Sequence, residues 1–242
     1  MSTVDLVLGE NFFGKEAARA SGRATLSAMV AVPSAPPKYI DSVAYPAPSA
    51  DVDQRIVLNG ITWRDYCVLR ELLDSPGVRM TYLEGSLEIM SPSRKHEDIK
   101  TRIARLLELY ALERDMPLQG YGSTTFRSEP RERGLEPDEC YVVGAPQAEG
   151  YPDLAIEVTV TSGGLNKLAV YRGLGVREVW MWRDGAIAVY VLGPEGYEER
   201  SGSAVAPHID LGAIARFAAM PDQHEALKGY RALLRSGRTL PL

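Results

Sequence analysis

The run Leu154–Val158 constrains the fold of this chain most, because it is apolar on both faces of a strand except at Glu157. Strands of this kind lie inside sheets whose two faces are covered by other elements. A carboxylate is costly to bury without a partner, so buried acids usually meet a cation or a metal. The run therefore predicts a central, buried strand that carries one acid with a chemical role.

A second acid precedes Glu157 in the sequence at a spacing that suits two neighbouring strands. Asp138 belongs to the segment Glu136–Glu139, at the start of a strand predicted over 139–143, and a turn with Gly and Pro over 144–152 follows. This spacing allows two neighbouring strands to bring the carboxylates of Asp138 and Glu157 together. Two oxygen ligands, with water for the rest, suit Mg²⁺, and a metal held in this way can activate water at a phosphodiester. An acid and base pair of the glycosidase type fits the apolar strand less well.

Four other residues are candidates for the same site. Asp153 would lie about 13 Å along the strand from Glu157, too far to share one ion, so we expect it to open the strand or to support the site. Lys167 could fold back from a short helix to the carboxylates and to a phosphate, or be a solvated helix lysine. Glu84, at the tip of a hairpin, could be a third carboxylate or only a polar turn residue. His96 could support the site or cap the helix that follows it.

The rest of the chain alternates helices and short strands. A helix begins after Thr62, which is a good N-cap, and ends at Ser75. A hairpin over 78–90 turns at Glu84-Gly85. The pattern also predicts helices over 97–113, 165–173, 211–219 and 225–234, and strands over 118–127, 139–143, 154–159, 178–183 and 186–191. We therefore expect an α/β or α+β fold, with a mixed central sheet flanked by helices.

Residues 1–52 differ from the rest, because five prolines separated mainly by Ala and Ser lie between residues 31 and 50. Such a segment has little to bury and cannot propagate a helix. We predict an irregular N-terminal arm over 1–52, either without a chemical role or packed on a partner subunit. The folded domain is predicted over 53–242.

Composition limits the class of protein. The formal charge of −5 argues against a generally basic surface for nucleic acid, though a local patch remains open. Two cysteines are too few for a disulfide scaffold or a Cys-rich zinc site and suit a reducing, cytoplasmic compartment. No apolar run is long enough for a membrane span, and no signal peptide is evident, so no membrane partner is expected. Basic residues that could contact a DNA backbone, or form a solvated helix face, are Arg94, Lys95, Lys100, Arg102 and Arg105, with Arg127, Arg131 and Arg133 as further candidates.

Several segments together resemble a known family. They are Thr81–Pro92, His96-Glu97, Gly134–Tyr141, Pro152–Val158 and Lys167–Tyr171 through Gly175–Trp180. They are similar to the Uma-two family, a bacterial group described as restriction endonucleases with the PD-(D/E)XK nuclease fold. The resemblance covers roughly residues 55–220.

The resemblance implies a restriction-endonuclease-like core in which Asp138 opens one strand and Glu157 lies midway along the next. The standard site of this fold has a lysine two residues after the second acid, where this chain has Thr159. The resemblance implies that Lys167 supplies the cation instead and that Glu84 is the outer carboxylate. Asp138, Glu157 and Lys167 would be the catalytic residues, and Glu84, Asp138 and Glu157 the metal ligands.

The function expected from these residues is Mg²⁺-dependent hydrolysis of DNA phosphodiester bonds, with Mn²⁺ as a substitute ion and a homodimer as the expected assembly. A second hypothesis is a non-catalytic module that binds DNA or protein on a nuclease-like fold, because Thr159 replaces the standard lysine and a fold does not fix a function.

Overall fold

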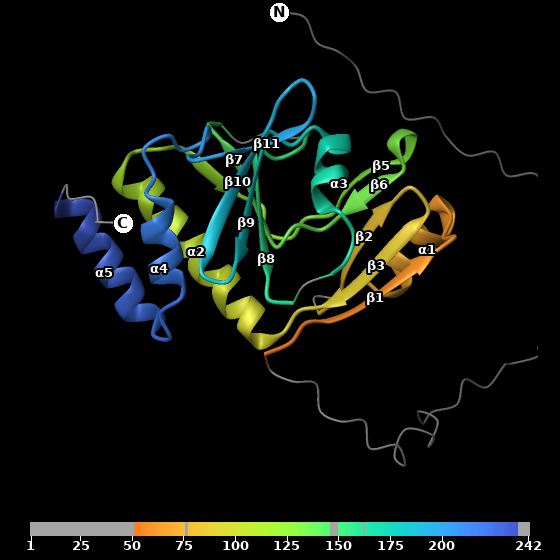
Figure 1. Cartoon of the computed structure of the whole chain (residues 1–242), viewed down its shortest axis with the longest axis horizontal. Helices are drawn as coiled ribbons and strands as arrows, with labels where there is room; N and C mark the ends of the chain where they lie inside the picture. The colour runs from red at the N-terminus through yellow and green to blue at the C-terminus, as the bar shows by residue number, and fades with distance from the viewer. Residues whose placement is uncertain (1–50, 76, 146–149, 162, 237–242) are drawn as a thin grey trace, which may run out of the picture. The chain divides into compact units, whose positions relative to one another are not determined.

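The structure is a computed structural model that describes residues 51–236, except residues 76, 146–149 and 162. Residues 1–50 of the predicted arm lie outside the described residues, so the arm stays a prediction. The described strands form two sheets rather than one central sheet, and helices cover them (Figure 1). The predicted α+β class, with a restriction-endonuclease-like arrangement, is confirmed.

The first sheet is antiparallel and has the strand order β1-β3-β2-β6-β5. Its strands are β1 (Gln54–Asn59), β2 (Arg79–Leu83), β3 (Ser86–Ser91), β5 (Phe126–Ser128) and β6 (Arg133–Leu135), with the short helix η2 (Glu129–Arg131) before β6. The predicted hairpin is confirmed as β2 and β3. Glu84 and Gly85 both have positive φ (45° and 90°), as a two-residue hairpin turn that matches the strand twist requires.

Helix α1 (Trp63–Leu72) packs on the first sheet. The predicted N-cap is confirmed: the Thr62 side chain accepts a hydrogen bond from the Asp65 amide, and the Asp65 carboxylate accepts one from the Thr62 amide. Tyr66 of this helix is fully buried and stacks on Tyr82 of β2, with ring centroids 5.0 Å apart. Trp63 of the same helix also packs on Tyr82, with ring centroids 5.6 Å apart, so a capped helix with two aromatic side chains fixes the outer layer of the fold.

The second sheet is mixed and has the strand order β11-β10-β9-β8-β7-β4. Its strands are β4 (Leu118–Gly120), β7 (Glu139–Val143), β8 (Leu154–Thr159), β9 (Glu178–Arg183), β10 (Ala186–Leu192) and β11 (Tyr197–Arg200). Strands β8 and β9 are parallel, and helix α3 (Lys167–Leu174) makes the crossover between them. Strand β8 is buried along nearly its whole length, so the predicted central strand is confirmed.

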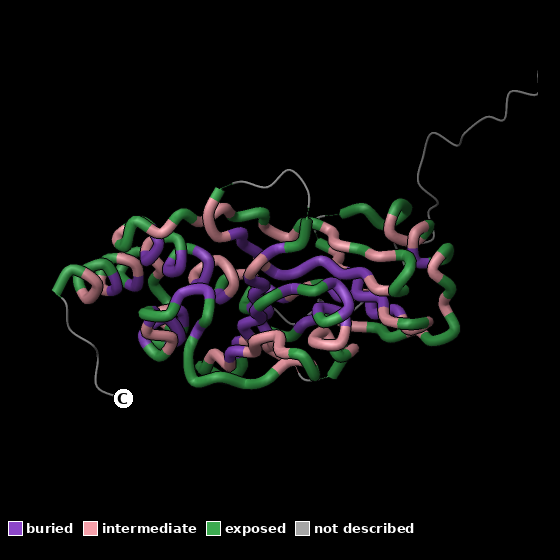
Figure 2. Tube along the Cα trace, turned by 90° about the horizontal axis from the view of Figure 1, so that it is seen from above, coloured by how far each residue is buried: buried purple, intermediate pink, exposed green. Residues whose placement is uncertain are grey.

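Alternation along β8 separates two cores. Leu154, Ile156 and Val158 face the main core, which helices α2 (Arg94–Glu113), α4 (Leu211–Ala218) and α5 (Gln223–Ser236) cover. Ala155 faces the opposite way and packs against α3, which also contacts β2, β5 and β6 of the first sheet. Glu157 shares the side of Ala155. The buried segments of both cores run through the interior of the described part (Figure 2).

Several predicted element boundaries were wrong, and α1 ends at Leu72 rather than at Ser75. The single strand predicted over 118–127 is two short strands, β4 and β5, in different sheets. A turn separates them: Gly122 has a φ of 59°, and the Thr124 hydroxyl donates to the Tyr121 carbonyl. Helix α2 begins three residues earlier than predicted, because the Ser93 side chain accepts a hydrogen bond from the His96 amide and caps it.

Within the described residues, no helix has the length and apolar character needed to cross a bilayer.

Candidate active site

Asp138 and Glu157 lie on neighbouring strands at corresponding positions. Strands β7 and β8 are antiparallel, with Glu139 opposite Ile156. Continuing that register by one residue sets Asp138 opposite Glu157, and directly opposed side chains point to the same face of a sheet. The Val158 amide donates to Asp138 Oδ2 at 2.7 Å. Both acids are almost fully buried, at 1% exposure each, so the strands hold two carboxylates side by side in the interior.

Lys167 supplies a cation to this acid pair from α3. It is the first residue of the helix, after the N-cap Asn166, and its Nζ lies 2.5 Å from Glu157 Oε2. Tyr171, one helical turn later, donates its hydroxyl proton to Glu157 Oε1. Residues four apart share one face of a helix, so α3 presents both partners to the same carboxylate.

The charges at the site depend on one another. Burial raises the pKa of Glu157, and the Asp138 charge adds to this, while Lys167 opposes it; the net pKa of Glu157 is raised. Burial acts on Asp138 in the same direction, but Lys167 and His96 outweigh it and hold the pKa of Asp138 well below its usual range. Burial would lower the pKa of Lys167, yet the neighbouring acids raise it. The ammonium of Lys167 therefore lets two carboxylates be buried together.

His96 joins Asp138 to a residue that the sequence pattern missed, Asp53. The fully buried imidazole has its Nε2 3.0 Å from Asp138 Oδ1 and its Nδ1 3.2 Å from Asp53 Oδ2. Asp53 also accepts a hydrogen bond from the Ser93 amide at 2.8 Å, and its own amide donates to the Thr161 hydroxyl. Its only sequence signal was an acid just before a short strand. His96 thus fixes the orientation of Asp138.

The position of His96 predicts a pH-dependent stability. Burial lowers the pKa of His96, but Asp138 and Asp53 outweigh it and raise the pKa from 6.5 to about 9. The charged imidazole therefore stabilises the fold fully below about pH 6.5, and this contribution is lost as the pH rises through about 9. At about 1.4 kcal/mol per pKa unit, the loss is on the order of 3 kcal/mol. We expect urea unfolding of the metal-free chain to show it between pH 6.5 and 9.5.

The matched controls are two histidine substitutions. His96→Gln should remove most of this pH dependence, whereas His208→Gln, at an exposed histidine, should keep it. An equal pH dependence in His96→Gln and the unchanged chain would contradict the ion pairing described for His96.

A cleft of about 320 Å³ opens beside Glu157 and Lys167. Glu88 of β3 lines it, is 2% exposed, and accepts a hydrogen bond from the Leu165 amide at 2.8 Å. Arg55 of β1 lies with its Nε 3.6 Å from Glu88. Sequence reasoning missed Glu88, although it carries the signal that marked Glu157, an acid between apolar residues of a strand. The remaining lining residues are Val158, Thr159, Gly163, Gly164, Asn166, Leu168, Met181 and Arg183, with Leu165 named above.

Two other candidates lie outside this cleft. Glu84 is at the hairpin turn, 60% exposed at its side chain, where its carboxylate pairs with Arg133 Nη2 at 2.6 Å. It is not among the residues that line the cleft. Asp153 precedes β8, and its Oδ2 accepts a hydrogen bond from the Val143 amide at 2.8 Å, which closes the connection from β7.

Comparison with family sequence models identifies the group to which this site belongs. The family described as "Uma2: Putative restriction endonuclease" matches residues 63–211, which is more than half of the chain. The chain belongs to the Uma2 family. This confirms the assignment made from the sequence motifs, and the family description supports nuclease function in general terms. A search of curated proteins found no match for this Uma2 chain.

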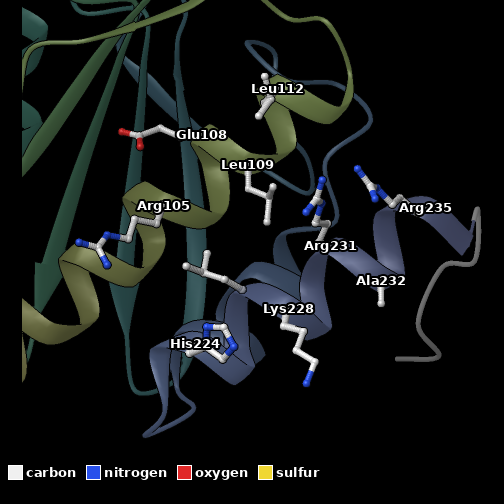
Figure 3. Close-up of a pocket in the computed structure, with 10 residues that line it drawn as sticks. Arg105, Glu108, Leu109, Leu112, His224, Lys228, Arg231, Ala232 and Arg235 are labelled. Carbon is white, nitrogen blue, oxygen red and sulfur yellow. The ribbon is translucent and has the colours of Figure 1, made fainter.

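The basic residues predicted to contact DNA do not form one patch in this Uma2 protein. Arg94 is exposed and Lys95 is exposed, but Lys100 pairs with Glu97 at 2.5 Å. Arg102 donates from Nε to the Ala218 carbonyl at 2.6 Å and so joins α2 to α4. Arg105 lines a different and larger groove of about 770 Å³ between α2 and α5 (Figure 3). Glu157 and Lys167 line the smaller cleft and neither lines that groove, so the smaller cleft is the candidate active site, with Asp138 buried behind Glu157 rather than lining it.

The donor atoms of this site suit a hard divalent cation. Among the residues that the structure describes, no three His, Cys, Asp or Glu side chains are grouped so as to hold a metal. Mg²⁺, however, is commonly bound through only one or two carboxylates, with water and substrate phosphate completing its shell. The oxygens of Asp138 and Glu157 each contact one protein donor, and a carboxylate oxygen offers two lone-pair positions. The two acids thus keep acceptor capacity for such an ion.

Proposed function

We propose that this Uma2 protein is an endonuclease that hydrolyses DNA phosphodiester bonds with Mg²⁺. The observation that carries the proposal is the pair of buried acids, Asp138 and Glu157, opposed on neighbouring strands with Lys167 Nζ 2.5 Å from Glu157. Glu157 and Lys167 line the open cleft, and Asp138 lies buried next to Glu157. Two acids and one cation in this arrangement are suited to phosphoryl chemistry, which depends on positioning and charge stabilisation. The family description points in the same direction.

Asp138 and Glu157 would hold Mg²⁺, which when bound lowers the pKa of water and stabilises negative charge on the phosphate. We assign the third acid of the site to Glu88 rather than Glu84, because Glu88 lines the cleft. Lys167 favours the ionised form of Glu157, against the effect of burial, and orients its carboxylate from α3. Tyr171 holds the other Glu157 oxygen, so that the acid has one orientation.

His96 performs the same positioning role for Asp138. His96 of α2 contacts Asp138 Oδ1, and the Val158 amide of β8 donates to Oδ2. Each oxygen of this acid is therefore held by a different element. Asp53 in turn fixes the imidazole. Preorganisation of this kind reduces the reorganisation that the reaction would otherwise require.

The experiment that tests the proposal is nicking of supercoiled plasmid by the full chain. We expect nicking in Mg²⁺, its loss on addition of EDTA, and its recovery with excess Mg²⁺ or Mn²⁺. Nicking that persists in EDTA would contradict the metal requirement, and the absence of nicking under all these conditions would contradict the enzyme assignment.

A specific observation favours a second candidate function, a non-catalytic module that binds DNA or protein. Thr159 stands where the related nuclease site has lysine, and both Glu157 oxygens already have protein donors. This candidate predicts binding without metal-dependent turnover. The homodimer expected from the sequence receives no support from the single chain.

A further inference from the structure

Arg183 lies on the same face of the second sheet as the proposed active site. It is the last residue of β9, and the parallel register with β8 pairs Arg183 with Thr159 and Met181 with Glu157. Strands lie about 4.8 Å apart and two residues span about 6.6 Å, so the backbone at Arg183 is about 8 Å from that at Glu157. All four of these residues line the cleft.

The other two cations of the cleft are already engaged by the protein. Lys167 has only 13% of its side chain exposed and pairs with Glu157. Arg55 is 16% exposed, lies beside Glu88, and donates from Nη1 to the Gly163 carbonyl. These contacts balance the two acids that line the cleft, so neither cation carries surplus charge toward a ligand.

Arg183 differs from both in exposure and in partners. It is exposed to solvent, and in the part of the chain that the structure describes no carboxylate lies within ion-pair distance of its guanidinium. Its neighbours in the ladder are Thr159 on one side and Ala186 on the other, both uncharged. The positive charge of Arg183 is therefore the surplus charge of the cleft lining.

We propose that Arg183 binds a backbone phosphate of the nucleic acid at the mouth of this cleft. The inference rests on the proposed function, and it names the residue that holds the substrate beside the acid pair. A guanidinium suits this role because its planar set of donors can bind two phosphate oxygens together. A sequence-independent contact is expected, since phosphates carry no base identity.

The test is the salt dependence of DNA binding by the full chain, measured by fluorescence anisotropy with a labelled 20-base-pair duplex in EDTA so that metal-dependent cleavage does not interfere. Each neutralised phosphate contributes about 0.9 to the slope of log affinity against log salt. We expect Arg183→Gln to lose one contact and therefore to have a shallower slope. When salt rises from 50 to 200 mM, the fold-loss of affinity in Arg183→Gln should be about 3.5 times smaller than the fold-loss in the unchanged chain. Arg183→Lys should restore the slope.

Arg177→Gln is the matched control, because it removes the same charge from another exposed arginine. Arg177 lies immediately before the first residue of β9, whereas Arg183 is its last residue. It should leave the slope unchanged. An unchanged slope in Arg183→Gln, or an equal loss in Arg177→Gln, would overturn the inference while leaving the nuclease proposal in place. A reduced slope without any plasmid nicking would support the phosphate contact and contradict only the enzyme. No binding by the unchanged chain at 50 mM salt would overturn the inference directly.

Discussion

Asp138→Asn and Glu157→Gln are each expected to reduce Mg²⁺-dependent plasmid nicking by about 10²–10³-fold, because metal and electrostatic stabilisation of a transition state is worth several kcal/mol. The amides keep the size of the side chains and remove the charge that a divalent cation needs. The two acids are opposed across β7 and β8, so each variant removes the charge of one of the two carboxylates proposed to hold the ion. Initial nicking rates in Mg²⁺ measure the effect.

Glu84→Gln is the matched control for these two variants. It neutralises an acid of the first sheet's hairpin turn that lies outside the cleft and is 60% exposed, so the nicking rate should stay close to that of the unchanged chain. Thermal unfolding of all three variants establishes that each is folded at the assay temperature. Unchanged nicking in both Asp138→Asn and Glu157→Gln would contradict the site assignment, regardless of the nicking rate of Glu84→Gln.

Lys167→Met is expected to lower the free energy of unfolding by about 3–5 kcal/mol at pH 7.5, because it leaves Glu157 buried without its cation and close to Asp138. The pKa of Glu157 is already raised in the folded chain, and loss of Lys167 raises it further. The destabilisation should therefore shrink as the pH falls toward 5, where Glu157 takes up a proton. Urea unfolding at the two pH values measures both effects.

A double variant separates the charge effect from simple loss of packing. Lys167→Met with Glu157→Gln should recover most of the stability, since no unpaired charge remains at this position. Lys228→Met provides the comparison, because Lys228 makes an exposed pair with Glu225 on α5, and such pairs contribute little. Equal destabilisation by the single and double variants would contradict the buried ion pair.

The sequence predicted the parts of the site that depend on strand patterning. An acid inside an otherwise apolar run identified Glu157. The spacing to the preceding strand identified Asp138, because two neighbouring strands joined by a turn can bring such positions together, and β7 and β8 do so. The short helix after the Glu157 strand made Lys167 a candidate cation, the family resemblance favoured it over a solvated lysine, and the structure brings Lys167 and Glu157 into contact.

Contacts between the two sheets could not be predicted in the same way. Glu88 and Arg55 reach the cleft from β3 and β1, and Asp53 reaches His96 from the residue before β1. Their positions depend on how the first sheet packs against α3 and the loop before it. Periodicity describes which face of an element is apolar, but not which element that face will meet. The split of residues 118–127 between two sheets has the same cause.

The central claim, that Asp138 and Glu157 hold a divalent cation, is tested most directly by calorimetric titration of Mg²⁺ into the metal-free full chain. The account predicts saturable binding of one ion per chain, with affinity at least tenfold weaker in Glu157→Gln and unchanged in Glu84→Gln. Absence of binding, or binding of equal strength in Glu157→Gln, would contradict it and favour the non-catalytic module.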